Sequence, residues 1–218
     1  TGVQTCALPI CQVYQGVGDV DPKIYAAVEA TRGQVLLMNG AIFECFFHST
    51  CGGVTCPGET GYNLTPMSAL SSVVCEGCGD ARFYRWKLEM QESVLRAAIQ
   101  RVAGPSGVSV GMIREVTPVD VCESGYVPYL KIRHDEGSLE ISTRRLRSSL
   151  GKSTPKVTLR SSAFDTSREG SRFVFQGRGW GHGVGVWQHG AKGYAKRKKT
   201  YDEILQHYYQ GTVLRALW

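Results

Sequence analysis

The 218-residue sequence has no apolar run long enough to cross a bilayer as a helix. It also lacks a basic run interleaved with aromatic residues, the pattern that is typical of nucleic-acid-binding segments. Its basic run, Lys196–Lys199, instead fits the solvent-exposed end of a helix, where cations oppose the negative end of the helix dipole. The sequence therefore gives no support to a membrane-spanning protein, and we expect no nucleic-acid partner.

The chain also lacks an internal repeat, a linker-like segment and the βαβ alternation of a doubly wound sheet. These absences favour an α+β protein, with mixed sheets, β-hairpins and several short helices in a single elaborated domain. A hydrophobic content of 42% and a charged content of 20% are ordinary for a globular chain. The net charge of +6 suits an anionic partner, although many proteins without such a partner share it.

Local signals predict the individual elements. Apolar spacing and helix-forming residues predict helices over residues 22–32, 91–103 and 143–150, and a capping box at Thr200 and Glu203 starts a fourth helix that Gly211 ends. Asn39-Gly40 between two apolar runs predicts a type I′ hairpin. Further strands are expected over the ranges 113–121, 126–134, 138–141, 156–159 and 172–175.

The most informative segment is residues 172–212, where glycines surround two Trp and two His side chains. Glycines this dense keep the backbone free of side-chain bulk and permit positive φ, so polar and aromatic side chains can converge on a ligand. Close packing alone would explain the glycines but not the rings among them. We expect ligand-facing roles for Arg178, Trp180, His182 and Gln188.

A second polar cluster is FHSTCGG at residues 47–53, at the far end of a hairpin strand. His48 and Ser49 precede a Gly-Gly turn, which would hold them at a rim. His48 could be a general base, a metal ligand, a hydrogen-bond donor to sugar, or a structural histidine tied to the backbone. Neighbouring residues on a strand point apart, which disfavours a Ser/His/Asp hydrolase built on Ser49 and His48.

Both segments closely resemble the signatures of the stage II sporulation protein D family, also called the LytB amidase-enhancer family. FHSTCGG and GRGWGHGVG (residues 177–185) carry the resemblance, which spans nearly all of residues 11–217. Members of that family act on peptidoglycan glycan strands. The resemblance therefore implies an exported protein of the cell envelope, with glycan strands and a cell-wall amidase as the partners to consider.

The run Ala81–Trp86 also resembles the family. Its aromatics beside arginines suit stacking on sugar rings, while Phe83 and Trp86 fit better on the core face of an edge strand. The resulting set of expected substrate-binding residues is His48, Ser49, Tyr84, Arg85, Arg178, Trp180, His182 and Gln188.

Cysteines add a separate prediction, because Cys75 and Cys78 form a C-x-x-C pair in the irregular 52–82 loop. Two more, Cys11 and Cys51, match positions where relatives often carry cysteine. These four could bind a structural zinc ion, with His48 able to replace one of them. Disulfides of an exported protein are an equal alternative. The cysteines outside this set fit buried small hydrophobes, and they are Cys45, Cys56 and Cys122.

Sporulation members of the family are lytic transglycosylases, which cleave the MurNAc-GlcNAc bond and leave 1,6-anhydro ends. A single carboxylic acid with a raised pKa protonates the glycosidic oxygen. The family's Glu lies in a Ser-Glu-Met-Pro-like motif, upstream of the segment that matches Cys11 to Tyr14. Neither that motif nor the Ala-Ala-Arg helix end after it occurs here, and Glu29, Glu44 and Glu59 match no such motif. We therefore expect no catalytic residue in this chain, although the full-length parent would be an enzyme.

The first ten residues, TGVQTCALPI, resemble the translation of a sequencing-library adapter. We expect residues 1–10 to be an artefact and exclude them from fold reasoning, the alternative being a genuine short loop that carries Cys6. Residues 11–218 are then a stage II sporulation protein D-like domain without its N-terminal catalytic and targeting segments.

Two other functions stay open. One is a non-catalytic glycan-binding enhancer of a cell-wall amidase, and the other is a zinc- or disulfide-stapled structural protein of the envelope. Binding to purified glycan strands separates them, since a purely structural protein would not bind.

Overall fold

The computed structural model describes residues 21–76, 79, 81–153 and 157–218. Helices and strands are both abundant in these residues, so the predicted α+β class is confirmed. The described residues divide into two compact units, one formed by residues 21–35 with Leu214–Trp218 and the other by the described part of Leu36–Val213. The segment interpreted as an adapter, residues 1–10, lies outside the described residues, as does Cys11.

The elements have the following bounds. The helices are α1 (Pro22–Ala30), α2 (Gly58–Tyr62), α3 (Glu92–Ala103), α4 (Thr143–Ser153), α5 (Gln188–Lys196) and α6 (Tyr201–Tyr208). The strands are β1 (Gln34–Met38), β2 (Ala41–Ile42), β3 (Phe47–His48), β4 (Arg85–Gln91), β5 (Ile113–Val119), β6 (Tyr129–His134), β7 (Gly137–Ser142), β8 (Phe164–Glu169), β9 (Arg172–Arg178), β10 (Val186–Trp187) and β11 (Val213–Ala216). Within the described residues they form sheets in the orders β11-β1-β2, β10-β3, β4-β9-β8 and β5-β6-β7.

Helix α1 is the only helix of the smaller unit among the described residues. Its first turn is capped by Asp21, whose Oδ1 accepts a hydrogen bond from the Lys23 backbone N–H at 2.8 Å. Pro22 occupies the first helical position, where the N–H that it lacks would have no partner in the helix. The helix predicted for residues 22–32 is thus confirmed, with an end two residues earlier.

The hairpin between β1 and β2 is also confirmed. The strands pair antiparallel, with Leu37 opposite Ile42 and Met38 opposite Ala41. Asn39 and Gly40 both have positive φ, at 52° and 81°, as a type I′ turn requires.

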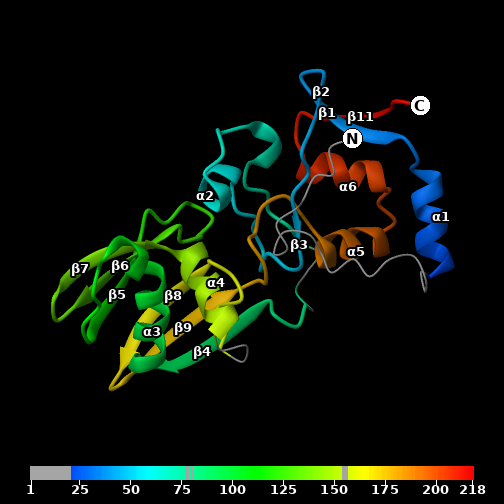
Figure 1. The fold of residues 1–218 in the computed structure, drawn as a ribbon. Coiled ribbons are helices and arrows are strands. Elements are labelled where there is room, and N and C mark those ends of the chain that lie inside the picture. Colours follow the sequence, from blue (N-terminus) through cyan, green and yellow to red (C-terminus); the bar gives the residue numbers. More distant parts are fainter. Residues whose placement is uncertain (1–20, 77–78, 80, 154–156) are drawn as a thin grey trace. The chain divides into compact units, whose positions relative to one another are not determined.

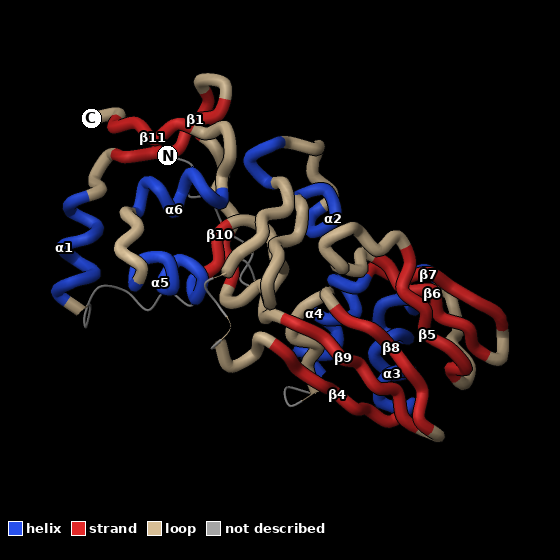
Figure 2. Tube along the Cα trace, turned by 180° about the vertical axis from the view of Figure 1, so that it is seen from behind, coloured by secondary structure: helices blue, strands red, loops and turns tan. Residues whose placement is uncertain are grey.

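The main core lies in the larger unit, where α3 and α4 pack against the sheets β4-β9-β8 and β5-β6-β7. Figure 1 shows both helices against these strands, and Figure 2 shows β4, β9 and β8 side by side with the helices behind them. Helix α3 buries one apolar face at helical spacing, as predicted. Its buried residues are Leu95, Ala98, Ile99, Val102 and Ala103.

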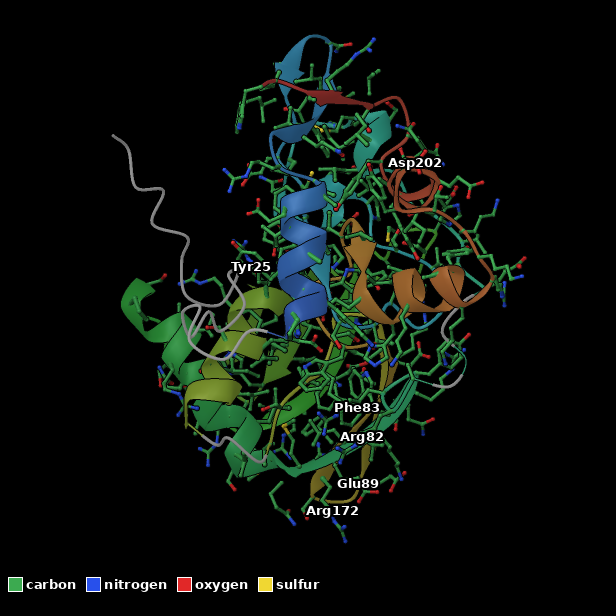
Figure 3. The ribbon with its side chains drawn as sticks, turned by 90° about the vertical axis from the view of Figure 1, so that its right-hand side faces the viewer. Tyr25, Arg82, Phe83, Glu89, Arg172 and Asp202 are labelled. Carbon is green, nitrogen blue, oxygen red and sulfur yellow. The ribbon has the colours of Figure 1, made fainter. Side chains whose placement is uncertain are left out.

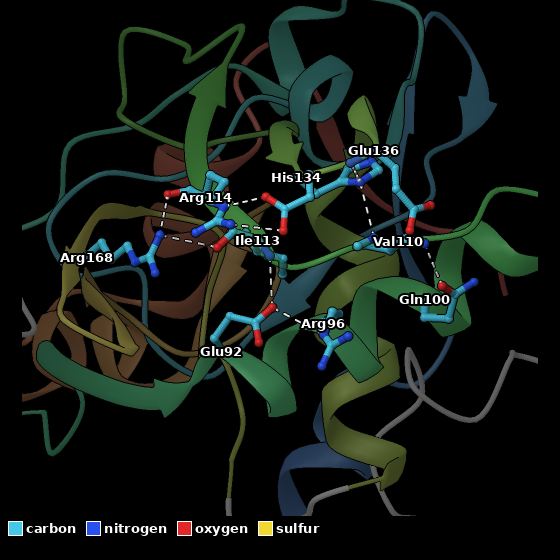
Figure 4. Close-up of polar contacts among 11 residues, drawn as sticks. Glu92, Arg96, Gln100, Val110, Ile113, Arg114, His134, Glu136 and Arg168 are labelled. Carbon is cyan, nitrogen blue, oxygen red and sulfur yellow. Dashed lines mark hydrogen bonds and ion pairs between the residues drawn. The ribbon is translucent and has the colours of Figure 1, made fainter.

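Polar contacts connect the start of β5 to α3 and β8 (Figure 4). The Glu92 carboxylate accepts the Ile113 backbone N–H at 2.9 Å, and Arg96 lies 3.3 Å from the same carboxylate oxygen. From the other side, the Arg168 guanidinium donates to the backbone oxygens of Ile113 and Arg114 at 3.4 and 3.0 Å. These contacts satisfy backbone groups at a place where β5 has no neighbouring strand beyond β6.

One strand prediction is wrong. Residues 157–159 of the KVTL segment form no strand, and β9 pairs with β4 on one side and on the other with β8, whose sequence is polar. Leu159 is fully buried, and its backbone oxygen accepts a hydrogen bond from the Arg147 side chain at 3.0 Å instead of a strand neighbour. β8 was not predicted, because its sequence has no apolar alternation that would indicate a strand. It is a strand because it pairs with β9.

The capping box of α6 is confirmed. The Glu203 carboxylate accepts the Thr200 backbone N–H at 2.9 Å, and the Thr200 side chain caps the N-terminal turn in return. Gly211 follows the helix with a φ of 80°. The loop 52–82 is largely irregular, as predicted, apart from α2 and one short 3₁₀ turn. Within the described residues, no helix has the length and apolar character needed to span a membrane.

Candidate functional site

The two signature segments lie side by side. Strand β3 pairs in parallel with β10, which places Phe47 opposite Val186 and His48 opposite Trp187. Beyond this short sheet, Thr50 and Trp180 form an isolated bridge in which each backbone N–H donates to the other's oxygen, at 3.0 and 2.6 Å. The backbone thus brings FHSTCGG and GRGWGHGVG together.

Glycine is required where the two segments approach most closely. A Cβ on Gly179 would lie 2.6 Å from the Thr50 backbone oxygen, and one on Gly185 would lie 2.1 Å from that of Phe46. Both residues also have positive φ, at 76° and 70°. These glycines therefore serve backbone-to-backbone packing.

His48 lies inside this packed region, with 4% of its surface exposed. Its Nδ1 lies 3.1 Å from the Val184 backbone oxygen, so Nδ1 carries the proton and donates it. Burial first, and then the neighbouring His182, lowers the pKa of His48 to about 3. His48 is a neutral ring whose Nε2 lone pair has no hydrogen-bond partner among the described residues.

The ring of His182 is also fixed by hydrogen bonds to the backbone. Its Nδ1 accepts the Val184 backbone N–H at 3.1 Å, so the proton is on Nε2, which donates to the Phe47 backbone oxygen at 2.8 Å. Burial is the main cause that lowers the pKa of His182 to about 4. Both ring nitrogens are occupied, and the ring joins the glycine loop to β3 instead of facing a ligand.

Ser49 and Trp180 meet at a surface cavity of about 460 Å³. Trp180 exposes 44% of its surface, whereas Phe83 beside it in the cavity is half-buried. The cavity is lined by Ser49, Thr50, Arg82, Phe83, Arg160, Trp180 and His189.

An aromatic ring and two arginines pack beside Trp180. The Phe83 ring stands perpendicular to the Trp180 ring, with centroids 4.8 Å apart. The Arg160 guanidinium lies 3.6 Å from the centroid of Phe83, and that of Arg82 lies 5.0 Å from it. Figure 3 shows Arg82 and Phe83 next to each other ahead of β4, with the Glu89 and Arg172 pair at the far end of the strand.

His189 closes another edge of the cavity, at the first turn of α5. Its Nδ1 lies 3.1 Å from the Ser49 backbone oxygen and 3.4 Å from the Thr50 hydroxyl. Gln188, the first residue of α5, is exposed on the same turn but does not line the cavity.

Arg85 and Arg178 line a different and larger cavity of about 790 Å³. The Arg178 guanidinium donates to the backbone oxygens of Cys51, Gly52 and Ser124. Arg85 lies 4.3 Å over the ring of Tyr84 and donates to Gly52 at 3.1 Å. These arginines brace the FHSTCGG turn, and neither has an acidic partner among the described residues.

Comparison with known proteins identifies the family. A family model described as "Domain of unknown function (DUF8618)" matches residues 60–185. The "Stage II sporulation protein D" of Bacillus subtilis (strain 168) is 31% identical over 193 residues, covering 87% of this chain and 50% of that protein. The chain belongs to the DUF8618 family and to the stage II sporulation protein D and amidase-enhancer family.

Two further relatives are similar over nearly the whole chain. The "Amidase enhancer" of Bacillus subtilis (strain 168) is 36% identical over 250 residues, covering 94% of this chain and 34% of that protein. An uncharacterized protein of Brachyspira hyodysenteriae is 29% identical over 202 residues, covering 92% of this chain and 50% of its own length. This member of the stage II sporulation protein D family thus spans half or less of the length of these relatives.

The sequence patterns did not point to two of the residues that line the cavity around Trp180, namely Phe83 and Arg160. Phe83 was predicted to face the core, but it precedes β4, is half-buried and lines the cavity. Trp86, two residues into β4 and 8% exposed, does belong to the core, as predicted. Arg160 carried no signal at all, because it lies in an irregular stretch outside every motif that resembles the family.

The cysteines predicted to bind zinc or form disulfides are described only in part, since Cys11 and Cys78 lie outside the described residues. Cys51 and Cys75 are both buried, and Cys75 accepts a hydrogen bond from the Tyr208 hydroxyl at 3.2 Å. Within the described part of the chain, no three His, Cys, Asp or Glu side chains gather as a metal site would need. Zinc and disulfide therefore remain alternative predictions.

Proposed function

We propose that this chain binds peptidoglycan glycan strands at the cavity around Trp180. One observation supports this above all: an exposed Trp180 ring, backed by Phe83 and Arg160, stands where the two signature segments pair. Flat aromatic faces pack well against the apolar faces of sugar rings. Arg82 and Arg160 add donors for carboxylate or hydroxyl oxygens of the strand.

Binding, not bond cleavage, is the function that we propose for the described residues. No Asp or Glu is among the residues that line this cavity. His48 and His182 are neutral at physiological pH and commit their protons to backbone oxygens. Protonating a glycosidic oxygen requires a well-placed carboxylic acid. We propose lytic transglycosylase activity only for the whole protein, with its acid outside these residues.

The setting that we propose is the bacterial cell envelope, outside the cytoplasm. The names of the relatives, stage II sporulation protein D and amidase enhancer, support a role connected with the cell wall. The net charge of +6 also suits an anionic cell wall.

A second candidate is enhancement of a cell-wall amidase, which the amidase enhancer at 36% identity supports. The two candidates differ in what they need. Glycan binding requires only this chain and the strands, whereas enhancement requires a purified amidase and appears as faster release of peptides from the wall.

The test is co-sedimentation of the purified chain with glycan strands, with and without their peptides. We expect Trp180→Ala to weaken binding about tenfold, which corresponds to roughly 1.4 kcal/mol. The matched control is Trp218→Ala, because Trp218 is an exposed indole, 80% exposed, that lies outside the cavity. Wild-type affinity in Trp180→Ala would overturn the proposal, as would equal loss in both variants.

A further inference from the structure

Another cavity of the larger unit, of about 430 Å³, shares no lining residue with the cavity around Trp180 or with the larger cavity. Its walls come from α2 and Asn63, from the loop between β5 and β6, from Ser162 and from the start of α4. Its volume falls within the range of about 300–1,000 Å³ that is typical of small-molecule sites.

Backbone hydrogen bonds fix the walls of this cavity. The Thr143 N–H at the start of α4 donates to the Pro128 oxygen at 2.9 Å. The Val127 N–H donates to the Ser162 oxygen at 2.8 Å. The loop before β6 is therefore tied both to α4 and to the segment before β8, and the cavity keeps its shape without a ligand.

The cavity is lined by two carboxylates and two guanidinium groups, and the residues are Glu59, Asp120, Arg144 and Arg145. All four are exposed, and none forms an ion pair with a described residue. Other surface arginines of the same unit do have carboxylate partners, among them Arg114, Arg133 and Arg172. Opposite charges that surround one cavity without pairing are available to a ligand inside it.

Helix stability does not explain the two arginines. Arg144 and Arg145 lie in the first turn of α4, which has no acidic residue, and cations there oppose the positive end of the helix dipole. The Arg144 guanidinium lies 5.4 Å from the centroid of the Tyr62 ring, which keeps it next to α2. Arg147, further along α4, instead has a structural role, since it donates to two backbone oxygens at 3.0 and 2.7 Å.

We propose that this cavity binds a short peptide with a free amino group and a free carboxylate. The carboxylate of the ligand accepts hydrogen bonds from the guanidinium groups of Arg144 and Arg145, which suit a carboxylate in geometry and charge. The ammonium group of the ligand donates to the carboxylates of Glu59 and Asp120. No bond is made or broken, so the site is one of binding only.

The balance of charge selects this class of ligand. A site for phosphate or for a polyanion would have an excess of cations, whereas here two arginines face two carboxylates. Uncharged polar side chains can serve the peptide groups of the ligand, and those in the lining are Thr60, Asn63, Ser142 and Ser162. The inference does not depend on the proposed glycan binding, because no residue lines both this cavity and the one around Trp180.

Titration of the isotope-labelled whole chain with the dipeptide alanyl-alanine, followed by NMR of the backbone amides, tests the site. We expect saturable shifts of amides in residues 59–63, 120 and 142–145, and none at Trp180. Three further probes are the N-acetylated dipeptide, the dipeptide amide and inorganic phosphate. Blocking either end of the dipeptide removes one of its charges and should weaken binding about fivefold or more.

Variants assign the two charges of the ligand to the two sides of the site. Arg145→Gln and Asp120→Asn should each weaken binding of the dipeptide about fivefold. Asn tolerates the positive φ of 53° at position 120, and Arg145→Gln removes a cation from the start of a helix, so both variants should fold. The matched controls are Arg133→Gln and Glu140→Gln, which are exposed positions outside the cavity and should bind as the wild type does.

Three results would overturn the proposal. They are equal affinity for the free and the blocked dipeptides, phosphate binding as tight as that of the dipeptide, and wild-type affinity in both Arg145→Gln and Asp120→Asn. The first two are measured on the wild type and decide the question even if a variant does not fold.

Discussion

Two regions of the larger unit are stabilised by different kinds of contact. In the sheet-and-helix region, formed by β4-β9-β8, β5-β6-β7, α3 and α4, buried aliphatic and aromatic side chains fill the interior. In the signature region, residues 46–57 with 177–190, the backbones of two segments touch through glycines, and buried polar rings hydrogen-bond to the backbone.

The difference predicts opposite sensitivities. Removing atoms from the sheet-and-helix region leaves a cavity, so large-to-small changes should be the harmful ones there. The signature region has no side chain to shorten at its closest approaches, so adding a single methyl group should be the harmful change. Mutations of each kind in each region therefore test whether the two regions differ in this way.

The largest effect is expected from Gly185→Ala in the signature region. Its new methyl carbon would lie 2.1 Å from the Phe46 backbone oxygen, which cannot move without disturbing the pairing of β3 with β10. Clash and positive-φ strain together should lower the free energy of unfolding by about 3–5 kcal/mol, measured by urea denaturation.

The matched control for that change is Gly170→Ala in the hairpin between β8 and β9. Gly170 has a similar φ of 61°, but nothing lies within 4 Å of its added methyl group. It should lose about 1–2 kcal/mol from backbone strain alone. Equal losses of unfolding free energy at Gly185 and Gly170 would show that the signature region relaxes around an added methyl group. The predicted difference in sensitivity between the two regions would then be wrong.

The next effect is expected from Leu95→Ala in the sheet-and-helix region. Leu95 is fully buried on α3, so truncation should lower the free energy of unfolding by about 3 kcal/mol. Ser93→Ala, at an exposed position of the same helix, should change it by less than about 0.5 kcal/mol. Glycan co-sedimentation of folded Leu95→Ala should equal that of the wild type, and a loss of binding would mean that the two regions are coupled.

The pH dependence of stability should report on the signature region. His48 and His182 have pKa values lowered to about 3 and 4, below the value near 6.5 of an unfolded histidine, so the unfolded chain binds more protons in between. Stability should therefore be highest above about pH 6.5 and fall as the pH drops toward 4, by at most about 1.4 kcal/mol per pH unit for each ring.

The control for this prediction is His48→Asn, whose amide can still donate to the Val184 backbone oxygen but does not titrate. Its urea midpoint should depend less steeply on pH between 6.5 and 4.5 than that of the wild type. If the urea midpoint of His48→Asn depends on pH as steeply as that of the wild type, His48 accepts a proton in the folded state and is not a buried neutral ring.

The contrast between the regions also explains what the sequence could predict. Helix α3 and the hairpin at Asn39-Gly40 are encoded locally, by apolar spacing and by residues that tolerate positive φ. The pairing of β3 with β10 is not encoded locally, because strands of two residues have no apolar periodicity to detect. Resemblance to the family marked both segments, but the structure alone placed them side by side.

The candidate site was predictable to the same limited extent. Trp180 and Ser49 were found from their motifs, and they do share a cavity. Arg160 was missed because it contacts Trp180 and Phe83 from an irregular segment whose position depends on tertiary packing. His182 was expected to face a ligand, and a motif cannot reveal that both its nitrogens are occupied by backbone groups.

The smallest expected effect concerns α6, which places Ile204 and Tyr208 in the interior next to β10. Thr200→Ala removes the side chain that caps this helix, and Glu203 keeps its hydrogen bond to the backbone N–H of residue 200. The loss should be about 1 kcal/mol by thermal or urea unfolding, with most of it restored in Thr200→Ser. A loss as large as that of Gly185→Ala would mean that the helix start, and not the glycine backbone contacts, fixes the signature region.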